Sequence, residues 1–163
     1  MALHPQLDEL IQRVLPVVQD FHRICMFAPH AATIDKAGIL TGRALATDGT
    51  AQLSVTQAIE QLESSFAHQA MLGEIQASGI FYHSSGTVTL AGGFSLPPAA
   101  NADECKALSA LLEHAIGESV YLLIPYSGEP PSVVYAVGNL IKKPAKVFVP
   151  QQTPGKKPWW KFR

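Results

Sequence analysis

The stretch SVTQAIEQLESSFAHQAMLGEIQASGIFYH, residues 54–83, contains the two patterns that decide the fold class. Ser54 and Gln57 have the spacing of a helix capping box, and apolar residues follow at helical spacing to about Met71. Further along, Gly79–His83 is rich in aromatic and β-branched residues, as is typical of a strand. The stretch therefore predicts a helix followed by a strand.

The same patterns recur on both sides of this stretch. Upstream, the apolar spacing of Leu7–Phe27 predicts an amphipathic helix, and Ala37–Ala46 reads as a short strand. Downstream, Thr87–Leu90 would pair with Gly79–His83 as a hairpin, and a capping-box candidate at Asn101 opens a third predicted helix that ends near Gly117. The remaining predicted strands are Ser119–Tyr126, Ser132–Ile141 and Lys146–Val149. We therefore expect an α+β (α/β) fold, with a single mixed sheet of about six strands packed with three helices.

Length and composition indicate one folded unit. The chain has 163 residues, of which 47% are apolar and 15% charged, which is enough to bury the core of one domain and too apolar for a disordered protein. No apolar run approaches the roughly 20 residues of a transmembrane helix, and residues 1–10 lack the pattern of a secretory signal. Cys25 and Cys105 are distant in sequence, so we expect free thiols and a cytoplasmic protein. The predicted domain covers residues 1–150, with a tail over 151–163.

Charge is unevenly distributed along the chain. From Pro130 onward there is no acid but 7 of the 12 basic residues, whereas the rest holds all 13 acids against 5 bases. The tail could fold back so that Trp159 and Trp160 cover an apolar patch of the body, or it could dock on an anionic surface, a nucleic acid or a protein partner. In the docking hypothesis the contact residues are Lys156, Lys157, Trp159, Trp160, Lys161, Phe162 and Arg163.

Several short motifs occur in the order that a known family shows. They are His4-Pro5 near the start, Asp35 ahead of Gly38-Ile-Leu-Thr-Gly42, the run Gly79-Ile-Phe-Tyr-His-Ser-Ser85, and Asp103 before an apolar stretch. This order resembles the MPN domain, the fold of the JAMM metallopeptidases that remove ubiquitin-like tags. The resemblance covers roughly residues 2–140.

The resemblance implies a set of site residues. In the family, two histidines and an aspartate bind a catalytic zinc and a glutamate moves protons; the matching residues here are His83 and Asp103 as metal ligands and Asp35 as the catalytic carboxylate. Ser85 stands where the second histidine belongs, and a hydroxyl is a poor zinc ligand. We therefore expect weak zinc binding or none, no other cofactor, and a scaffold rather than a peptidase.

Three hypotheses remain open from the sequence. The leading one is a non-catalytic or marginally active MPN-like domain that binds a protein partner or a second copy of itself. The second is an unrelated α+β interaction module, of roadblock or profilin-like type, that binds an anionic partner through its tail. The third is a zinc-dependent isopeptidase. Against the site reading, Asp35 could be a turn residue, His83 a hairpin or surface residue, and Asp103 a first-turn acid.

Overall fold

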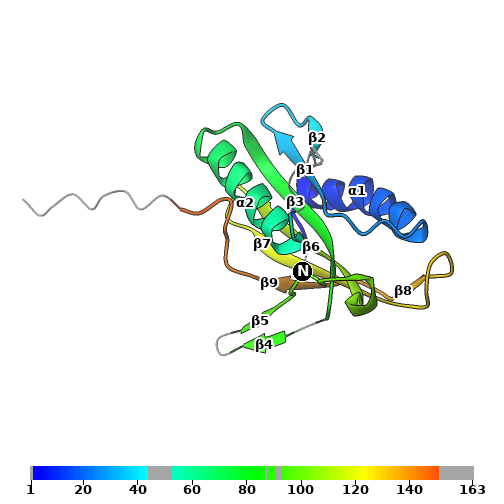
Figure 1. The fold of residues 1–163 in the computed structure, drawn as a ribbon. Helices are drawn as coiled ribbons and strands as arrows, with labels where there is room; N and C mark the ends of the chain where they lie inside the picture. The colour runs from blue at the N-terminus through cyan, green and yellow to red at the C-terminus, as the bar shows by residue number, and fades with distance from the viewer. Residues whose placement is uncertain (1, 44–52, 87, 91–92, 151–163) are drawn as a thin grey trace, which may run out of the picture.

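A curled antiparallel sheet with two helices forms the structure (Figure 1). The computed structural model describes residues 2–43, 53–86, 88–90 and 93–150. The helices are α1 (Pro5–Arg23), α2 (Val55–Met71) and the short 3-10 helix η1 (Ala102–Glu104). The strands are β1 (His30–Asp35), β2 (Leu40–Arg43), β3 (Ile75–Ser84), β4 (Val88–Leu90), β5 (Gly93–Ser95), β6 (Ala107–His114), β7 (Ser119–Ser127), β8 (Val134–Tyr135) and β9 (Asn139–Lys142).

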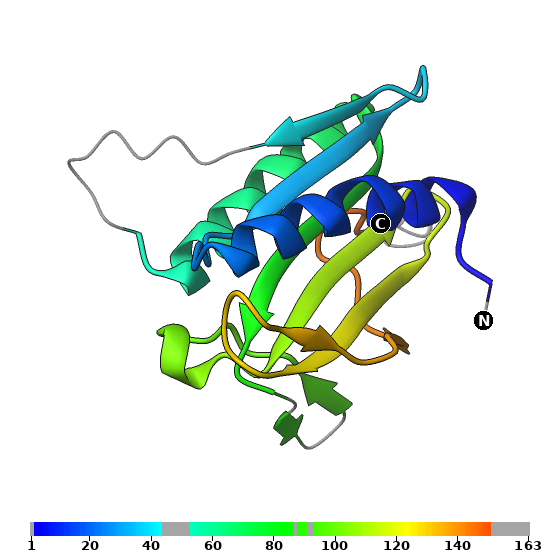
Figure 2. The same ribbon diagram turned by 90° about the vertical axis from the view of Figure 1, so that its right-hand side faces the viewer.

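The main sheet has the order β2-β1-β3-β6-β7, and both β8 and β9 pair with β7. Strands β4 and β5 pair only with each other. Helix α1 crosses one face of the main sheet and α2 the other, so the sheet lies between two helical layers (Figure 2). The predicted α+β fold with a sheet of about six strands is confirmed.

Side chains of β3 point alternately to the two faces of the sheet, so this strand contributes to both cores. Phe81 belongs to the core under α1, whereas Ile80 and Tyr82 belong to the core under α2. Helix α1 contributes the buried stripe Leu7, Leu10, Val14 and Val18. Two separate apolar cores therefore hold the helices in place.

Helix α2 begins where the capping box predicts. The Ser54 hydroxyl accepts from the Gln57 N–H at 3.1 Å, and the Gln57 side chain accepts from the Ser54 N–H at 3.0 Å. The helix continues to Met71, with Ile59, Leu62 and Phe66 buried. This element is confirmed in both its bounds and its buried face.

The third predicted helix is wrong. Its first residues form only η1, and the apolar run that follows is strand β6. Because β6 lies between β3 and β7 and a helical layer covers each face of the sheet, both of its faces are buried and its apolar residues are nearly continuous. A run of this kind also satisfies helical spacing.

The predicted strand pairing is also corrected. Strand β3 pairs with β1 and β6, and β4 turns back on β5, so the expected hairpin between β3 and β4 does not form. Every described pairing is antiparallel rather than mixed, because short connections join β1 to β2 and β6 to β7. Lys146–Val149 is not a strand but part of an irregular segment, residues 143–150, that we call the C-terminal strap. Among the helices of the described residues, none has the length and apolarity to cross a membrane.

Candidate binding groove

Asp35 lies in the tight turn between β1 and β2. Its Oδ1 atom accepts from the N–H groups of Ala37 and Ile39, both at 2.9 Å. A carboxylate that holds its own turn in this way is explained by local structure. Asp35 is therefore a turn residue, which was the alternative to its role as the catalytic carboxylate.

His83 is enclosed at the far end of β3. The side chain is 3% exposed; its Nδ1 lies 3.1 Å from the Tyr126 hydroxyl, and its ring packs edge-on against His22 with the centroids 4.5 Å apart. Its Nε2 atom is buried, with no hydrogen-bond partner among the described residues. Burial, and then the nearby His22 and His30, lowers the pKa of His83 to about 3. The ring is therefore neutral at neutral pH and forms part of the core.

Asp103 lies in η1 with an exposed side chain. Its backbone N–H donates to the Asn101 side chain at 3.0 Å, so Asn101 caps this turn. Asp103 is thus an acid in the first turn of a short helix, as its alternative reading held, although that helix is a 3-10 turn.

The three residues proposed for a zinc site do not converge. Asp35 pairs with Ile75, and His83 lies eight residues further along β3, about 27 Å away at strand spacing. Across residues 2–43, 53–86, 88–90 and 93–150, no cluster of three or more histidine, cysteine, aspartate or glutamate side chains is placed to bind a metal ion. These residues therefore do not fit a zinc, and no catalytic step follows from them.

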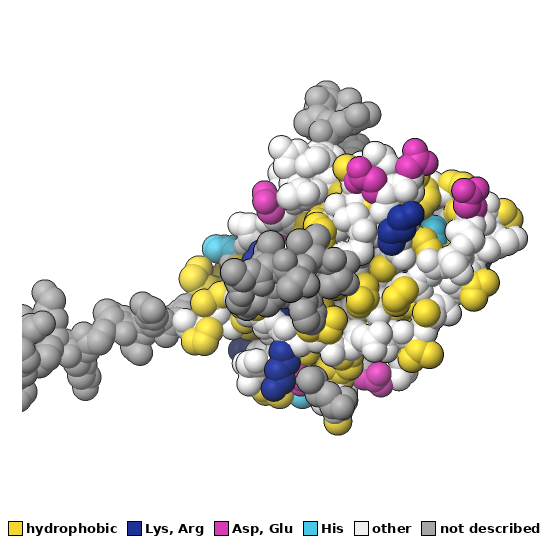
Figure 3. All heavy atoms as spheres, turned by 90° about the horizontal axis from the view of Figure 1, so that it is seen from below, with side chains coloured by type: hydrophobic (Ala, Val, Ile, Leu, Met, Phe, Trp, Pro, Cys, Tyr) yellow, Lys and Arg dark blue, Asp and Glu magenta, His cyan; other side chains and the backbone are white. Residues whose placement is uncertain are grey.

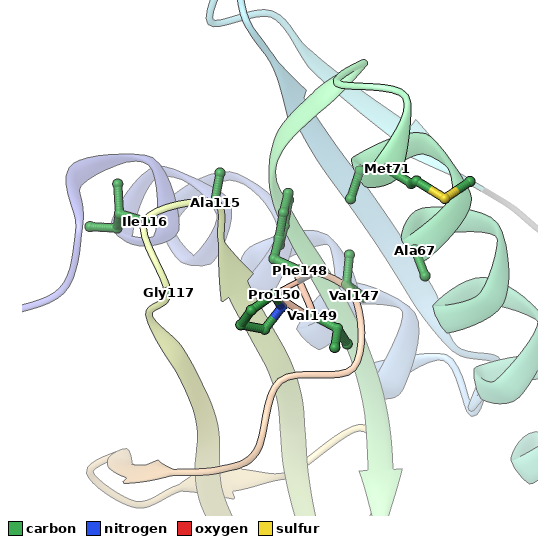
Figure 4. A pocket seen from close by; sticks show the side chains of 10 residues that line it. Ala67, Met71, Ala115, Ile116, Gly117, Val147, Phe148, Val149 and Pro150 are labelled. Atoms are coloured by element: carbon green, nitrogen blue, oxygen red, sulfur yellow. The ribbon is translucent and has the colours of Figure 1, made fainter. Parts of the chain in front are cut away.

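A different site lies at the opposite end of the sheet from His83. Three segments surround a groove of about 760 Å³: the end of α2, the turn between β6 and β7, and the C-terminal strap (Figure 4). We call it the apolar groove, because all its lining side chains are hydrophobic. The lining residues are Ala67, Ala70, Met71, Ala115, Ile116, Gly117, Val147, Phe148, Val149 and Pro150.

Much of this lining reaches solvent. Met71 is 59% exposed, Ile116 69% and Val149 57%. Seen from below Figure 1, hydrophobic side chains extend to the end of the molecule where the described chain stops (Figure 3). Contiguous apolar surface of this kind commonly marks a binding site.

Glu113 on β6 fixes one wall of the groove. Its carboxylate pairs with the Lys143 ammonium group, and both side chains are 2% exposed. It also accepts from three backbone N–H groups of the strap, those of Lys146, Val147 and Phe148, at 2.8 to 3.0 Å. Burial favours the neutral acid, but the Lys143 pair and the N–H groups of Lys146 and Phe148 together lower the pKa of Glu113. The strap is thus held by an ionised carboxylate.

A second, smaller hollow of about 200 Å³ lies beside α2. It contains Glu63, Tyr82, Tyr121 and Lys146. Burial raises the pKa of Glu63, while Lys146 opposes this rise. The Tyr82 hydroxyl donates to the Leu96 carbonyl at 2.6 Å, so it is already committed to the fold. The hollow therefore offers two carboxyl groups, Glu60 and Glu63, beside Lys146.

Sequence reasoning missed the groove and its anchor. The lining residues are ordinary apolar residues from three segments between Ala67 and Pro150, and no spacing links them. Glu113 did leave a signal, since it is an acid within the apolar run Ala107–Ala115. The predicted tail contacts, Lys156, Lys157, Trp159, Trp160, Lys161, Phe162 and Arg163, lie outside the described residues.

Comparison with known proteins gives no relative to guide the assignment. Neither the family models, the curated proteins nor the solved structures yielded a match to this chain.

Proposed function

We propose that this chain is a non-catalytic interaction domain whose apolar groove binds a hydrophobic side chain of an acidic protein partner. The groove carries the proposal: its volume of about 760 Å³ lies in the range of known ligand pockets, and its lining side chains are all apolar. A small polar ligand would find no side chain there to orient it. An apolar anchor in a pocket is how many protein interfaces gain affinity.

The wall of the groove is already in place in this structure, which supports a role in binding. The buried Glu113 holds the strap against the sheet, so Val147 and Phe148 are positioned before any partner arrives. A site ordered in advance loses less conformational entropy on binding.

Charge supports an acidic partner. The groove ends at Pro150, and the residues that follow carry Lys156, Lys157, Lys161 and Arg163 without any acid. Acids of the partner that flank its apolar anchor could pair with these bases. We favour a protein over a nucleic acid, because the groove has a single aromatic side chain, Phe148, on which a base could stack.

A scaffold role agrees with the leading hypothesis from the sequence, but the support no longer comes from the MPN motif, since Asp35 on β1 pairs with Ile75 at the start of β3 and His83 lies near the end of β3. We place the protein in the cytoplasm. Both cysteines are free and Cys25 is exposed, as suits a reducing compartment.

Selection of random displayed peptides on the immobilised full chain tests this function. We expect the enriched peptides to share a large aliphatic or aromatic anchor next to two or more acids. They should also lose binding as salt rises, because salt screens the attraction between the peptide acids and the tail lysines.

The comparison variant is Ile116→Ser with Val149→Ser, which removes two exposed apolar side chains of the groove. Its control is Ile39→Ser, which removes an equally exposed one from the β1–β2 turn. Enrichment of peptides without an apolar anchor, or equal enrichment on the groove variant, would refute the proposal. Preferred binding of single-stranded nucleic acid would refute the protein partner.

A further inference from the structure

The described chain ends inside the wall of the apolar groove. Val149 and Pro150 both line it, and 13 residues follow them, 151–163. Residues 151–163 are joined directly to the groove wall, and a chain of this length can fold back onto it. The nearest candidate to occupy the groove is therefore this chain's own tail.

The tail sequence contains a turn motif a few residues after the groove wall. Thr153-Pro154-Gly155-Lys156 has proline and glycine at the two central positions, the pattern of a type II turn. A turn at this position would bring residues 157–163 back toward Val149 and Pro150, which line the groove.

These two tryptophans match the groove chemically. Tryptophan presents a large apolar surface with one polar N–H at its edge, and paired exposed tryptophans are unfavourable unless something covers them. The groove offers exposed apolar side chains at Met71, Ile116 and Val149, and it is open on one side so that an indole N–H can remain in water.

Charge favours the same arrangement. Residues before Pro130 hold 13 acids and 5 bases, whereas the tail carries only bases. Glu118, next to the groove residue Gly117, and Glu74, just beyond α2, are acids close to this end of the body. Lysines on either side of the tryptophan pair could pair with these two carboxylates.

We propose that, without a partner, Trp159 and Trp160 of the same chain occupy the apolar groove, and that a partner must displace them. The inference rests on the proposed function, since it concerns which segment occupies that binding site when no partner is bound. It makes the tail a competitor for the groove as well as a source of charge for the partner.

Tryptophan fluorescence of the intact chain tests this directly, because Trp159 and Trp160 are its only two tryptophans. The reference is a synthetic peptide of residues 151–163, excited at the red edge of the tryptophan band where tyrosine does not absorb. We expect the full chain to emit at shorter wavelength than the peptide and to resist quenching by acrylamide. Ile116→Ser with Val149→Ser should shift the emission to that of the peptide, and Ile39→Ser should leave it unchanged.

A second variant separates loss of the contact between tail and groove from loss of folding. Gly155→Val disfavours the turn without touching the body, and it should also shift the emission to that of the peptide. Wild-type emission and quenching equal to the peptide's would overturn the inference, as would a blue shift that survives the groove variant. A blue shift lost on dilution would instead assign the tail to the groove of a second copy and overturn occupation within one chain.

Peptide binding separates this inference from the proposed function. Trp159→Ser with Trp160→Ser keeps every tail lysine, and it should raise the affinity for a selected peptide by removing the competitor. If the affinity is unchanged but still depends on the groove, self-occupation fails while the proposed function stands. If no peptide binds at the groove and the fluorescence shift is present, the proposed function fails alone.

Discussion

At the scale of single residues, the most unusual environment is that of His83. Its imidazole is packed against His22 and Tyr126, and one ring nitrogen has no partner among the described residues. Burial lowers its pKa to about 3, whereas an unfolded histidine has a pKa near 6.5. Between these two pH values the unfolded chain therefore binds a proton at His83 and the folded chain does not. The stability that this ring supplies is present above pH 6.5 and is lost as the pH falls from there toward 3.

His83→Gln tests this linkage. We expect the free energy of unfolding of the wild type to fall by about 2 kcal/mol more between pH 7 and pH 5 than that of the variant, since the glutamine does not titrate. Urea unfolding at the two pH values measures both changes. His114, whose pKa burial also lowers, titrates in both proteins and cancels in the comparison, whereas His22 and His30 act on His83 and belong to the difference that is measured. Equal pH dependence of the two proteins would contradict the account of His83.

At the scale of elements, the C-terminal strap depends on one carboxylate. Glu113→Gln leaves the Lys143 ammonium group buried without its counter-ion and weakens the three backbone hydrogen bonds of the strap. We expect a loss of about 3–5 kcal/mol in the free energy of unfolding, measured by urea denaturation.

The double variant Glu113→Gln with Lys143→Met is the matched control. It removes the unpaired charge, so it should recover a large part of the stability lost in the single variant. A single variant within about 0.5 kcal/mol of the wild type, which is the ordinary effect of a surface substitution, would show that the pair does not hold the strap.

The elements also show where prediction from the sequence succeeds. Local signals were enough for α2, because a capping box and a buried stripe depend only on nearby residues. They failed for β6, because burial on both faces of a central strand erases the alternation that distinguishes a strand from a helix. Strand β1, His30–Asp35, went unpredicted, since its small buried residues Ala31 and Ala32 give little hydrophobic signal.

At the scale of the whole molecule, the groove exists only because the fold brings three distant segments together. The end of α2, the β6–β7 turn and the strap each carry a few apolar residues, and no one of these segments indicates a binding site by itself. The asymmetry of charge and the tail tryptophans were visible in the sequence, but the surface they would meet was not. The family resemblance, in turn, suggested residues that the register of β1 and β3 separates.

The binding role of the groove is tested most directly by calorimetric titration of one selected acidic peptide into three full-length proteins. These are the wild type, Ile116→Ser with Val149→Ser, and the control Ile39→Ser. We predict that the groove variant binds at least about 10-fold more weakly than the wild type, because two apolar contacts with the anchor are lost, and that the control binds within about 2-fold. Equal affinity of the groove variant and the wild type would contradict the assignment of the groove as the binding site.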